Sequence, residues 1–142
     1  MKPRVSLITL PVDDLQRALR FYRDGLGLPT QGIVGEEFEH GAVAFFELDG
    51  GLRLALWPRA SLAADSGIAI AGPSAAGICL AHNLSSKVEV DRLLAEVEAA
   101  GGRIAKAPCD TLWGGYAGYF QDLDGHLWEV AWNPQMLPEP GQ

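Results

Sequence analysis

The chain has 142 residues, of which 48% are hydrophobic and 20% charged, a balance typical of a folded globular protein and not of a disordered one. Its formal net charge of −7 is not offset by any basic cluster, so neither nucleic acid nor an anionic membrane surface is an expected partner. No stretch resembles a membrane span or a signal peptide, and we expect a soluble, cytoplasmic protein.

The first part of the chain predicts a strand, a helix and three further strands. An apolar run over 5–12 favours a strand, and Asp13 and Asp14 are good N-cap residues for a helix whose apolar positions follow a 3.6-residue period. Gly25 and Gly27 are expected to end that helix. The three strands are predicted over 30–36, 40–48 and 51–58.

A stretch without periodic pattern separates this part from a second one like it. Residues 59–76 are rich in Ala, Ser, Gly and Pro, and we expect a connector that packs over the domain or holds a short helical piece. A strand is then predicted over 77–84, followed by a helix for which Ser86 and Glu89 form a capping box. A short strand over 103–107 and a hairpin complete the pattern.

The order strand-helix-strand-strand-strand is therefore predicted twice, and we interpret it as an internal duplication of a βαβββ unit. An ordinary α+β domain whose halves look alike by chance is the alternative. We predict a single α+β domain over 1–142, built from two tandem βαβββ modules. Its parts are module 1 at about 4–58, a connector at 59–76, module 2 at about 77–134 and a loose tail at 135–142.

The most informative stretch is the aromatic-rich hairpin near the end of the chain, at 114–134. Its loop is the sequence Asp-Leu-Asp-Gly at 122–125, and we expect Gln121 to pair with His126 across it. Strand alternation then places one carboxylate, that of Glu129, on a face of otherwise apolar residues. The side chains predicted on that face are Tyr116, Gly118, Phe120, Leu127, Glu129 and Ala131.

Three stretches, at 9–15, 21–27 and 121–129, resemble the vicinal oxygen chelate superfamily, which includes glyoxalases, bleomycin-resistance proteins, fosfomycin-resistance enzymes and extradiol dioxygenases. The resemblance covers nearly the whole chain, with Asp-Leu-Asp-Gly standing where the family usually has Asp-Pro-Asp-Gly. It implies a curved mixed sheet around a cleft, with the helices on the outer face. It does not specify an activity, because this fold hosts many chemistries.

The resemblance also implies where a divalent metal would bind, since relatives hold it with a His on the first strand of a module and a Glu on the last. In this sequence those positions fall at Leu7, at Leu54 or Ala55, at Cys79 and at Glu129. Only Glu129 is a ready ligand for a hard cation, and Cys79 would be a soft partner for it. We therefore predict no metal ligands and no cofactor.

Without a metal, the resemblance implies an apolar and aromatic cleft for a small molecule. Glu129 is the candidate catalytic residue, either as a general base or as a ligand-orienting acceptor, unless a hydroxyl or backbone amide simply satisfies it. A filled core is the alternative for the aromatic residues. The predicted ligand contacts are Leu7, Thr9, Leu54, Trp57, Cys79, Trp113, Tyr116, Phe120, Leu127 and Glu129.

These features predict a glyoxalase- and bleomycin-resistance-like homodimer that binds a small, partly apolar or aromatic molecule. Whether it catalyses a reaction stays open. One alternative is a metal-dependent lyase, isomerase or dioxygenase of the glyoxalase type with an unconventional site. The other is a structural or partner-binding module whose cleft is filled by its own side chains.

Overall fold

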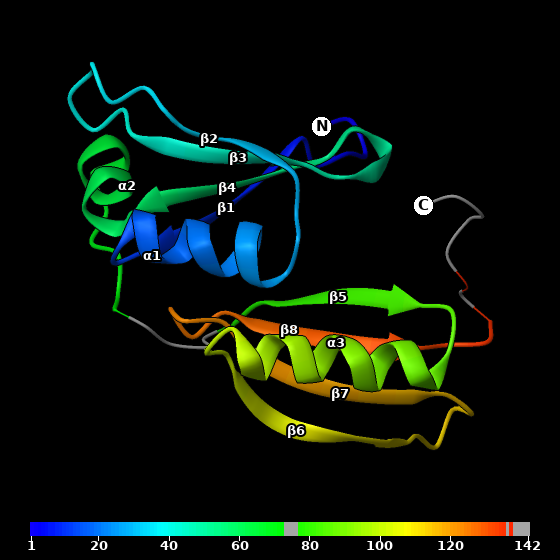
Figure 1. The fold of residues 1–142 in the computed structure, drawn as a ribbon. Coiled ribbons are helices and arrows are strands. Elements are labelled where there is room, and N and C mark those ends of the chain that lie inside the picture. The colour runs from blue at the N-terminus through cyan, green and yellow to red at the C-terminus, as the bar shows by residue number, and fades with distance from the viewer. Residues whose placement is uncertain (73–76, 136, 138–142) are drawn as a thin grey trace. The chain divides into compact units, whose positions relative to one another are not determined.

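A computed structural model describes residues 1–72, 77–135 and 137, and Figure 1 shows the fold. The chain divides into two compact units, Met1–Pro73 and Ser74–Gln142, and each is described here by itself. Most of the tail predicted over 135–142 lies outside the described residues. No helix in the described ranges is both long and apolar enough to span a membrane.

The first unit is a βαβββ module followed by a short helix. Its sheet has the order β1-β4-β3-β2, in which β1 runs parallel to β4 and the other pairs are antiparallel. The second helix, α2, lies where the sequence suggested a helical piece in the connector. The elements are β1 (Leu7–Val12), α1 (Leu15–Arg20), the π-helical turn η1 (Phe21–Gly25), β2 (Thr30–Val34), β3 (Val43–Glu47), the 3-10 turn η2 (Asp49–Gly51), β4 (Arg53–Pro58) and α2 (Arg59–Ser66).

The second unit repeats the same topology. Its sheet has the order β5-β8-β7-β6, and β5 runs parallel to β8 as β1 does to β4. Two four-stranded mixed sheets with helices confirm the predicted α+β class and the tandem βαβββ repeat. The elements are β5 (Cys79–Leu84), α3 (Lys87–Ala99), β6 (Arg103–Asp110), β7 (Tyr116–Gln121) and β8 (Leu127–Trp132).

Both predicted helix starts are confirmed by their caps. The Asp14 carboxylate accepts a 3.0 Å hydrogen bond from the backbone of Arg17 at the start of α1. Ser86 accepts from the Glu89 amide at 3.2 Å, and the Glu89 side chain accepts in return from the Ser85 amide at 2.8 Å. These reciprocal bonds satisfy backbone donors that the first turn of α3 leaves without helical partners.

Each module buries one face of its sheet against its long helix. In the first module Tyr22 of η1 packs on Phe46 of β3, with ring centroids 6.1 Å apart, and both are buried. In the second module α3 covers one face of the sheet, as Figure 1 shows, and its buried residues Val90, Leu94 and Val97 point to that face. We call the face of each sheet that lies opposite α1 or α3 the open face.

Candidate functional site

The register of the β7–β8 hairpin differs by one residue from the prediction. Gln121 lies opposite Leu127 and not His126. The last hydrogen bond before the loop runs from the Asp122 amide, and not from Gln121, to the His126 carbonyl, at 3.0 Å. The Asp122 side chain holds the loop in this form, accepting from the Asp124 amide at 3.0 Å and from the His126 amide at 2.8 Å. A shift of one residue moves a side chain from one face of a sheet to the other.

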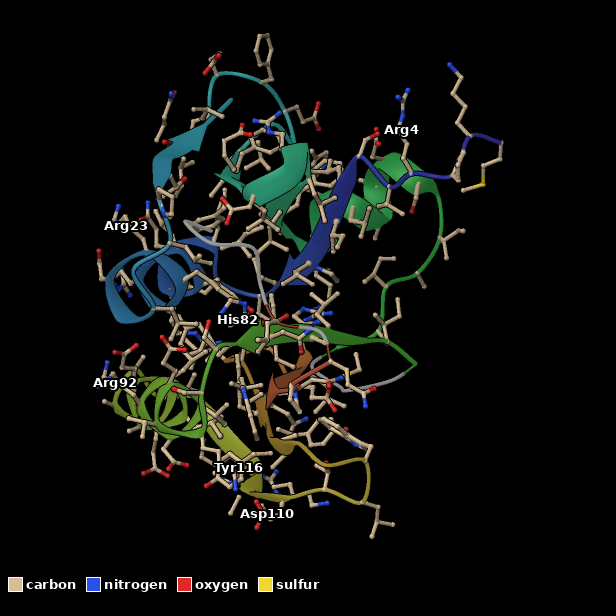
Figure 2. All side chains as sticks on the ribbon, turned by 90° about the vertical axis from the view of Figure 1, so that its right-hand side faces the viewer. Arg4, Arg23, His82, Arg92, Asp110 and Tyr116 are labelled. Atoms are coloured by element: carbon tan, nitrogen blue, oxygen red, sulfur yellow. The ribbon has the colours of Figure 1, made fainter. Side chains whose placement is uncertain are left out.

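The prediction that Tyr116 and Phe120 share a face with Glu129 is therefore wrong. Both lie on the face that α3 covers. Phe120 is 2% exposed and stacks on Trp128 at a centroid distance of 6.0 Å. Tyr116 donates a 2.6 Å hydrogen bond to Asp91 of α3, and it lies at the end of the module where Figure 2 labels Asp110. These two aromatic residues contribute to the helix–sheet packing.

The open face of the second module carries Glu129 beside a tyrosine that the sequence did not predict there. Tyr119 lies directly opposite Glu129, and its hydroxyl donates a 2.8 Å hydrogen bond to Glu129 Oε2. Both side chains are half-buried. The hydrogen bond to the carboxylate, followed by burial, raises the pKa of Tyr119, because both favour the neutral phenol. The residues of this face on β5, β7 and β8 are Cys79, Ala81, Asn83, Ala117, Tyr119, Gln121, Leu127, Glu129 and Ala131.

Cys79 lies on the same open face as Glu129, as predicted, and is exposed. Partial burial of the sulfur and the negative charge of Glu129 raise the pKa of the Cys79 thiol. A thiol with a raised pKa holds its proton near neutral pH and is a weak nucleophile. The carboxylate beside it therefore opposes a nucleophilic role for this cysteine.

In the first module the parallel register decides between Leu54 and Ala55. Leu7 pairs with Arg53, and Cys79 pairs with Leu127 at the equivalent position of the second module. Glu129 is two residues beyond Leu127, so its equivalent is two residues beyond Arg53, at Ala55. Leu54 is fully buried on the helix side, so it does not share the face of Leu7 as predicted. The residues of this module's open face are Leu7, Thr9, Phe45, Glu47, Arg53, Ala55 and Trp57.

The metal positions implied by the family resemblance are thus Leu7, Ala55, Cys79 and Glu129. Two of the four side chains have no donor atom, and a thiol beside a carboxylate makes a poor pair for a hard cation. In the described part of the chain no group of three or more His, Cys, Asp or Glu side chains is arranged to hold a metal ion. These positions do not fit the family's divalent metal.

The two tryptophans predicted near the mouth of a cleft occupy different settings. Trp57 lies on the open face of the first module, where its indole donates a 3.0 Å hydrogen bond to the His40 carbonyl. Trp113 precedes β7 in a loop and is 47% exposed. Its ring lies against Gly115, and a β-carbon at that glycine would come within 2.5 Å of it. A β-carbon at Gly115 would also lie 2.5 Å from the Trp132 carbonyl oxygen, so glycine leaves room there for both groups, whereas Trp57 is held by its hydrogen bond.

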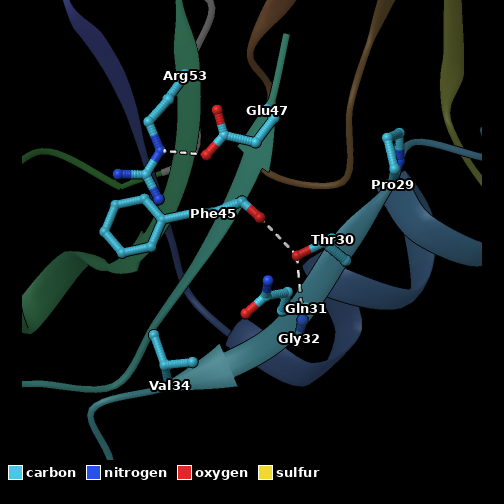
Figure 3. Close-up of a pocket in the computed structure, with 8 residues that line it drawn as sticks. All are labelled: Pro29, Thr30, Gln31, Gly32, Val34, Phe45, Glu47 and Arg53. Carbon is cyan, nitrogen blue, oxygen red and sulfur yellow. Dashed lines mark hydrogen bonds and ion pairs between the residues drawn. The ribbon is translucent and has the colours of Figure 1, made fainter.

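The structure also shows a hollow of about 490 Å³ in the first module, which the sequence analysis did not predict. Figure 3 shows it between the edge strand β2 and the open-face residues of β3 and β4. Arg53 forms part of one wall. Its Nε lies 2.8 Å from Glu47 Oε1, and its guanidinium carbon lies 4.2 Å from the centre of the Phe45 ring. The residues that line the hollow are Pro29, Thr30, Gln31, Gly32, Val34, Phe45, Glu47 and Arg53.

Different sequence signals could have found these missed residues. Strand alternation places Tyr119 on the face of Glu129 once five residues, 122–126, are counted as the connection of the hairpin. A side chain such as that of Asp122, which can accept from two loop amides, favours this longer connection. Arg53 and Glu47 flank the turn at 49–51, where oppositely charged residues commonly face each other across a hairpin. The hollow itself has no such signal, because it depends on an irregularity in β2.

The fold and site define a class of protein built from two tandem βαβββ modules, each with an open sheet face opposite its helix. A family model described as the Glyoxalase/Bleomycin resistance protein/Dioxygenase superfamily matches residues 4–130. The chain belongs to this superfamily.

Solved structures with the same fold agree with this assignment. A glyoxalase-related enzyme from Fulvimarina pelagi is 34% identical, with 93% of this chain and 89% of that chain covered and a TM-score of 0.81. A glyoxalase/bleomycin resistance protein/dioxygenase from Nocardioides is 29% identical, with coverages of 100% and 90% and a TM-score of 0.73. Lactoylglutathione lyase from Agrobacterium tumefaciens is 25% identical, with coverages of 98% and 100% and a TM-score of 0.65. No curated protein matches the chain.

Proposed function

We propose that this superfamily member binds a small, partly apolar or aromatic molecule on the open face of the second module, with Glu129 as the acceptor that orients it. The observation that carries the proposal is the Tyr119–Glu129 hydrogen bond, which lies next to the alanines Ala81 and Ala131. Tyr119 occupies Oε2 of the carboxylate, and Oε1 accepts no hydrogen bond from any described residue. Ala81, which lies opposite Glu129 on β5, is exposed, and its small side chain leaves the carboxylate open on that side.

The chemistry of this pair indicates what the ligand carries. A carboxylate oxygen accepts hydrogen bonds, so a hydroxyl or amine group on the ligand is the matching donor. The apolar surroundings favour an aromatic or aliphatic body. Tyr119 holds the carboxylate in one orientation, so that ligand binding does not have to order it. The expected ligand is thus a molecule with an apolar or aromatic body and a hydrogen-bond donor.

Ligand binding can be tested with two probes that differ by one donor, phenol and anisole. The chemical shifts of backbone amides in β7 and β8 should move on addition of phenol and less on addition of anisole. Glu129→Gln should weaken phenol binding by about fivefold or more, since hydrogen bonds to charged groups contribute about 1.5–3 kcal/mol. Glu98 is an exposed residue near the end of α3, so the control variant is Glu98→Gln, which should leave phenol binding unchanged. Equal phenol affinity in wild type and Glu129→Gln would remove the role of Glu129.

The alternative function is a metal-dependent lyase, isomerase or dioxygenase of the glyoxalase type. The observation in its favour is that Cys79 and Glu129, two potential metal ligands, lie on the same open face, on the adjacent strands β5 and β8. Elemental analysis of the purified protein, before and after incubation with Zn, Ni, Mn or Fe, separates the two functions. A stoichiometric metal that is lost in Glu129→Ala would support the enzyme and contradict the metal-free binding protein.

We propose further that two copies of the chain form a homodimer. Strands β1 and β5 are edge strands of their sheets and carry exposed apolar residues, with Leu7 at 43% exposure and Ile78, just before β5, at 75%. Such edges are normally covered, because their free amides and carbonyls pair readily with another strand. Light scattering coupled to size-exclusion chromatography should give twice the mass of one chain. A monomer at all concentrations would contradict the dimer.

A further inference from the structure

We propose that the hollow in the first module is a second ligand site, one that takes a small aromatic or apolar acid whose carboxylate or phosphate is held by Arg53. This site goes beyond the one around Glu129 and does not depend on it. Its residues come from β2, β3 and β4 and from Pro29 just before β2 (Figure 3).

An irregularity in β2 produces the hollow. The pairing of β2 with β3 shifts between Thr30 and Ile33, as at a β-bulge. The Thr30 hydroxyl fixes this shape by donating to the Phe45 carbonyl at 2.5 Å and accepting from the Gly32 amide at 3.1 Å. Gly32 has a φ of +88°, which other residues rarely adopt, and the space where its β-carbon would lie is open. The hollow is therefore built into the strand by specific residues.

The guanidinium of Arg53 has donors that the described protein does not use. Its Nε is buried and lies 2.8 Å from Glu47 Oε1 as an ion pair, but without hydrogen-bonding geometry. Its two Nη groups donate to no described residue. The guanidinium carbon lies over the Phe45 ring, 4.2 Å from its centre, and this cation–π contact favours the observed position of the side chain. A guanidinium with free N–H groups matches a carboxylate or phosphate, which it can bind through two parallel hydrogen bonds.

The walls beside Arg53 suit an apolar ligand body. Pro29, Val34 and the Phe45 ring provide apolar surface, and the Gln31 amide adds one polar group. A flat aromatic acid can therefore place its ring against these side chains and its anionic group at Arg53. A volume of about 490 Å³ lies within the range of small-molecule pockets.

The repeated fold indicates that the Arg53–Glu47 pair is not needed to hold the sheet together. The equivalent positions in the second module are Leu127 and Gln121, and the same strand pairing forms there without charges. The pair is also largely exposed, with 43% of the Arg53 side chain and 71% of the Glu47 side chain accessible. Ion pairs at such exposure stabilise a fold little. The anionic partner of Arg53 can thus be exchanged for a ligand at small cost.

The test uses benzoate and phenyl phosphate as acidic probes and benzamide as the neutral counterpart of benzoate. Binding is followed by backbone amide chemical shifts in the full chain. Both acids should change the chemical shifts of the amides of 30–34 and of Arg53. Benzamide should bind at least about tenfold more weakly than benzoate, because it lacks the charge that pairs with Arg53. Arg53→Gln should weaken benzoate by a similar factor. Arg23→Gln is a matched control, since Arg23 is also 43% exposed and paired with a carboxylate but lies on η1, outside the hollow.

A gain-of-affinity variant guards against a loss that comes only from misfolding. Glu47→Gln removes the carboxylate that competes for Arg53 and should tighten benzoate binding, whereas a purely structural ion pair gives no such gain. Glu129→Gln should leave benzoate binding at the hollow unchanged, which separates this site from the proposed function. The inference is overturned if neither acid shifts the amides of 30–34 at millimolar concentration, or if Arg53→Gln and Arg23→Gln behave alike.

Discussion

Phe45 in the first module and Tyr119 in the second occupy the same position of the repeat and differ by one hydroxyl group. Phe45 lies opposite Ala55 across β3 and β4, and Tyr119 lies opposite Glu129 across β7 and β8. The hydroxyl and the carboxylate that pair in the second module are therefore both missing from the first. Since the first module folds without them, the fold does not require this pair, which supports the ligand-binding role proposed for it.

The first prediction concerns the ionisation of Tyr119. The hydrogen bond to Glu129 is the main cause that raises the pKa of Tyr119 above its ordinary value of 10.0. Glu129→Gln should lower that pKa, because a neutral amide does not oppose the phenolate as a carboxylate does. The ultraviolet absorbance of phenolate, with Tyr119→Phe used to identify the signal, measures the shift. An unchanged titration in Glu129→Gln would mean that the hydrogen bond does not persist in solution.

The second prediction concerns stability at alkaline pH. Tyr116 donates a hydrogen bond to Asp91, and this bond raises the pKa of Tyr116 from 10.0 to about 12 in the folded protein. Burial is the next cause of the shift. The folded state therefore retains this proton more strongly than the unfolded chain. The resulting stability is fully present below pH 10 and is lost as the pH rises from 10 to about 12.

Asp91→Asn should reduce this loss, because the amide lacks the charge that opposes the phenolate. Urea unfolding of wild type and Asp91→Asn, at neutral pH and across the alkaline window, gives the comparison. The free energy of unfolding should fall less steeply with pH in the variant. Parallel curves for the two proteins would contradict the assigned role of Asp91.

The sequence predicted those parts of the fold that depend on short-range patterns. The apolar periodicity gave both long helices, and Asp14 and Ser86 marked where they begin. The repeat was visible because each module carries the same order of such patterns. These features need only neighbouring residues, so one sequence is enough to predict them.

The faces of the final hairpin could not be predicted in the same way, because they depend on the length of one loop. A connection closed at Gln121 and one closed at Asp122 are both compatible with the sequence of the turn. Two hydrogen bonds to the Asp122 side chain decide between them, and the choice reverses the facing of Tyr119 and Phe120. The choice between Leu54 and Ala55 likewise needed the pairing of distant strands.

The third prediction tests that loop directly. Asp122 is 5% exposed, and its Oδ1 accepts from the amides of Asp124 and His126. Asp122→Ala should destabilise the protein by about 2–3 kcal/mol, since one buried and one partly buried amide lose their acceptor. Asp122→Asn keeps an acceptor oxygen and should be less destabilising. Chemical denaturation measures both variants, and equal losses would show that the charge matters more than the two hydrogen bonds.

The fourth prediction concerns Gly118 of β7, which lies next to β6 in the sheet and faces α3. A β-carbon there would lie 2.8 Å from Leu94 Cδ1, 2.9 Å from the Lys106 carbonyl oxygen and 3.0 Å from the Pro108 nitrogen. The Leu94 side chain can move, but the two backbone atoms of β6 cannot do so without disturbing the sheet. Gly118→Ala should therefore lower the free energy of unfolding by about 1–3 kcal/mol. Gly72→Ala is the control, because a β-carbon at Gly72 would meet no atom within 4 Å. Thermal denaturation compares the two variants, and equal melting temperatures would contradict the close packing at Gly118.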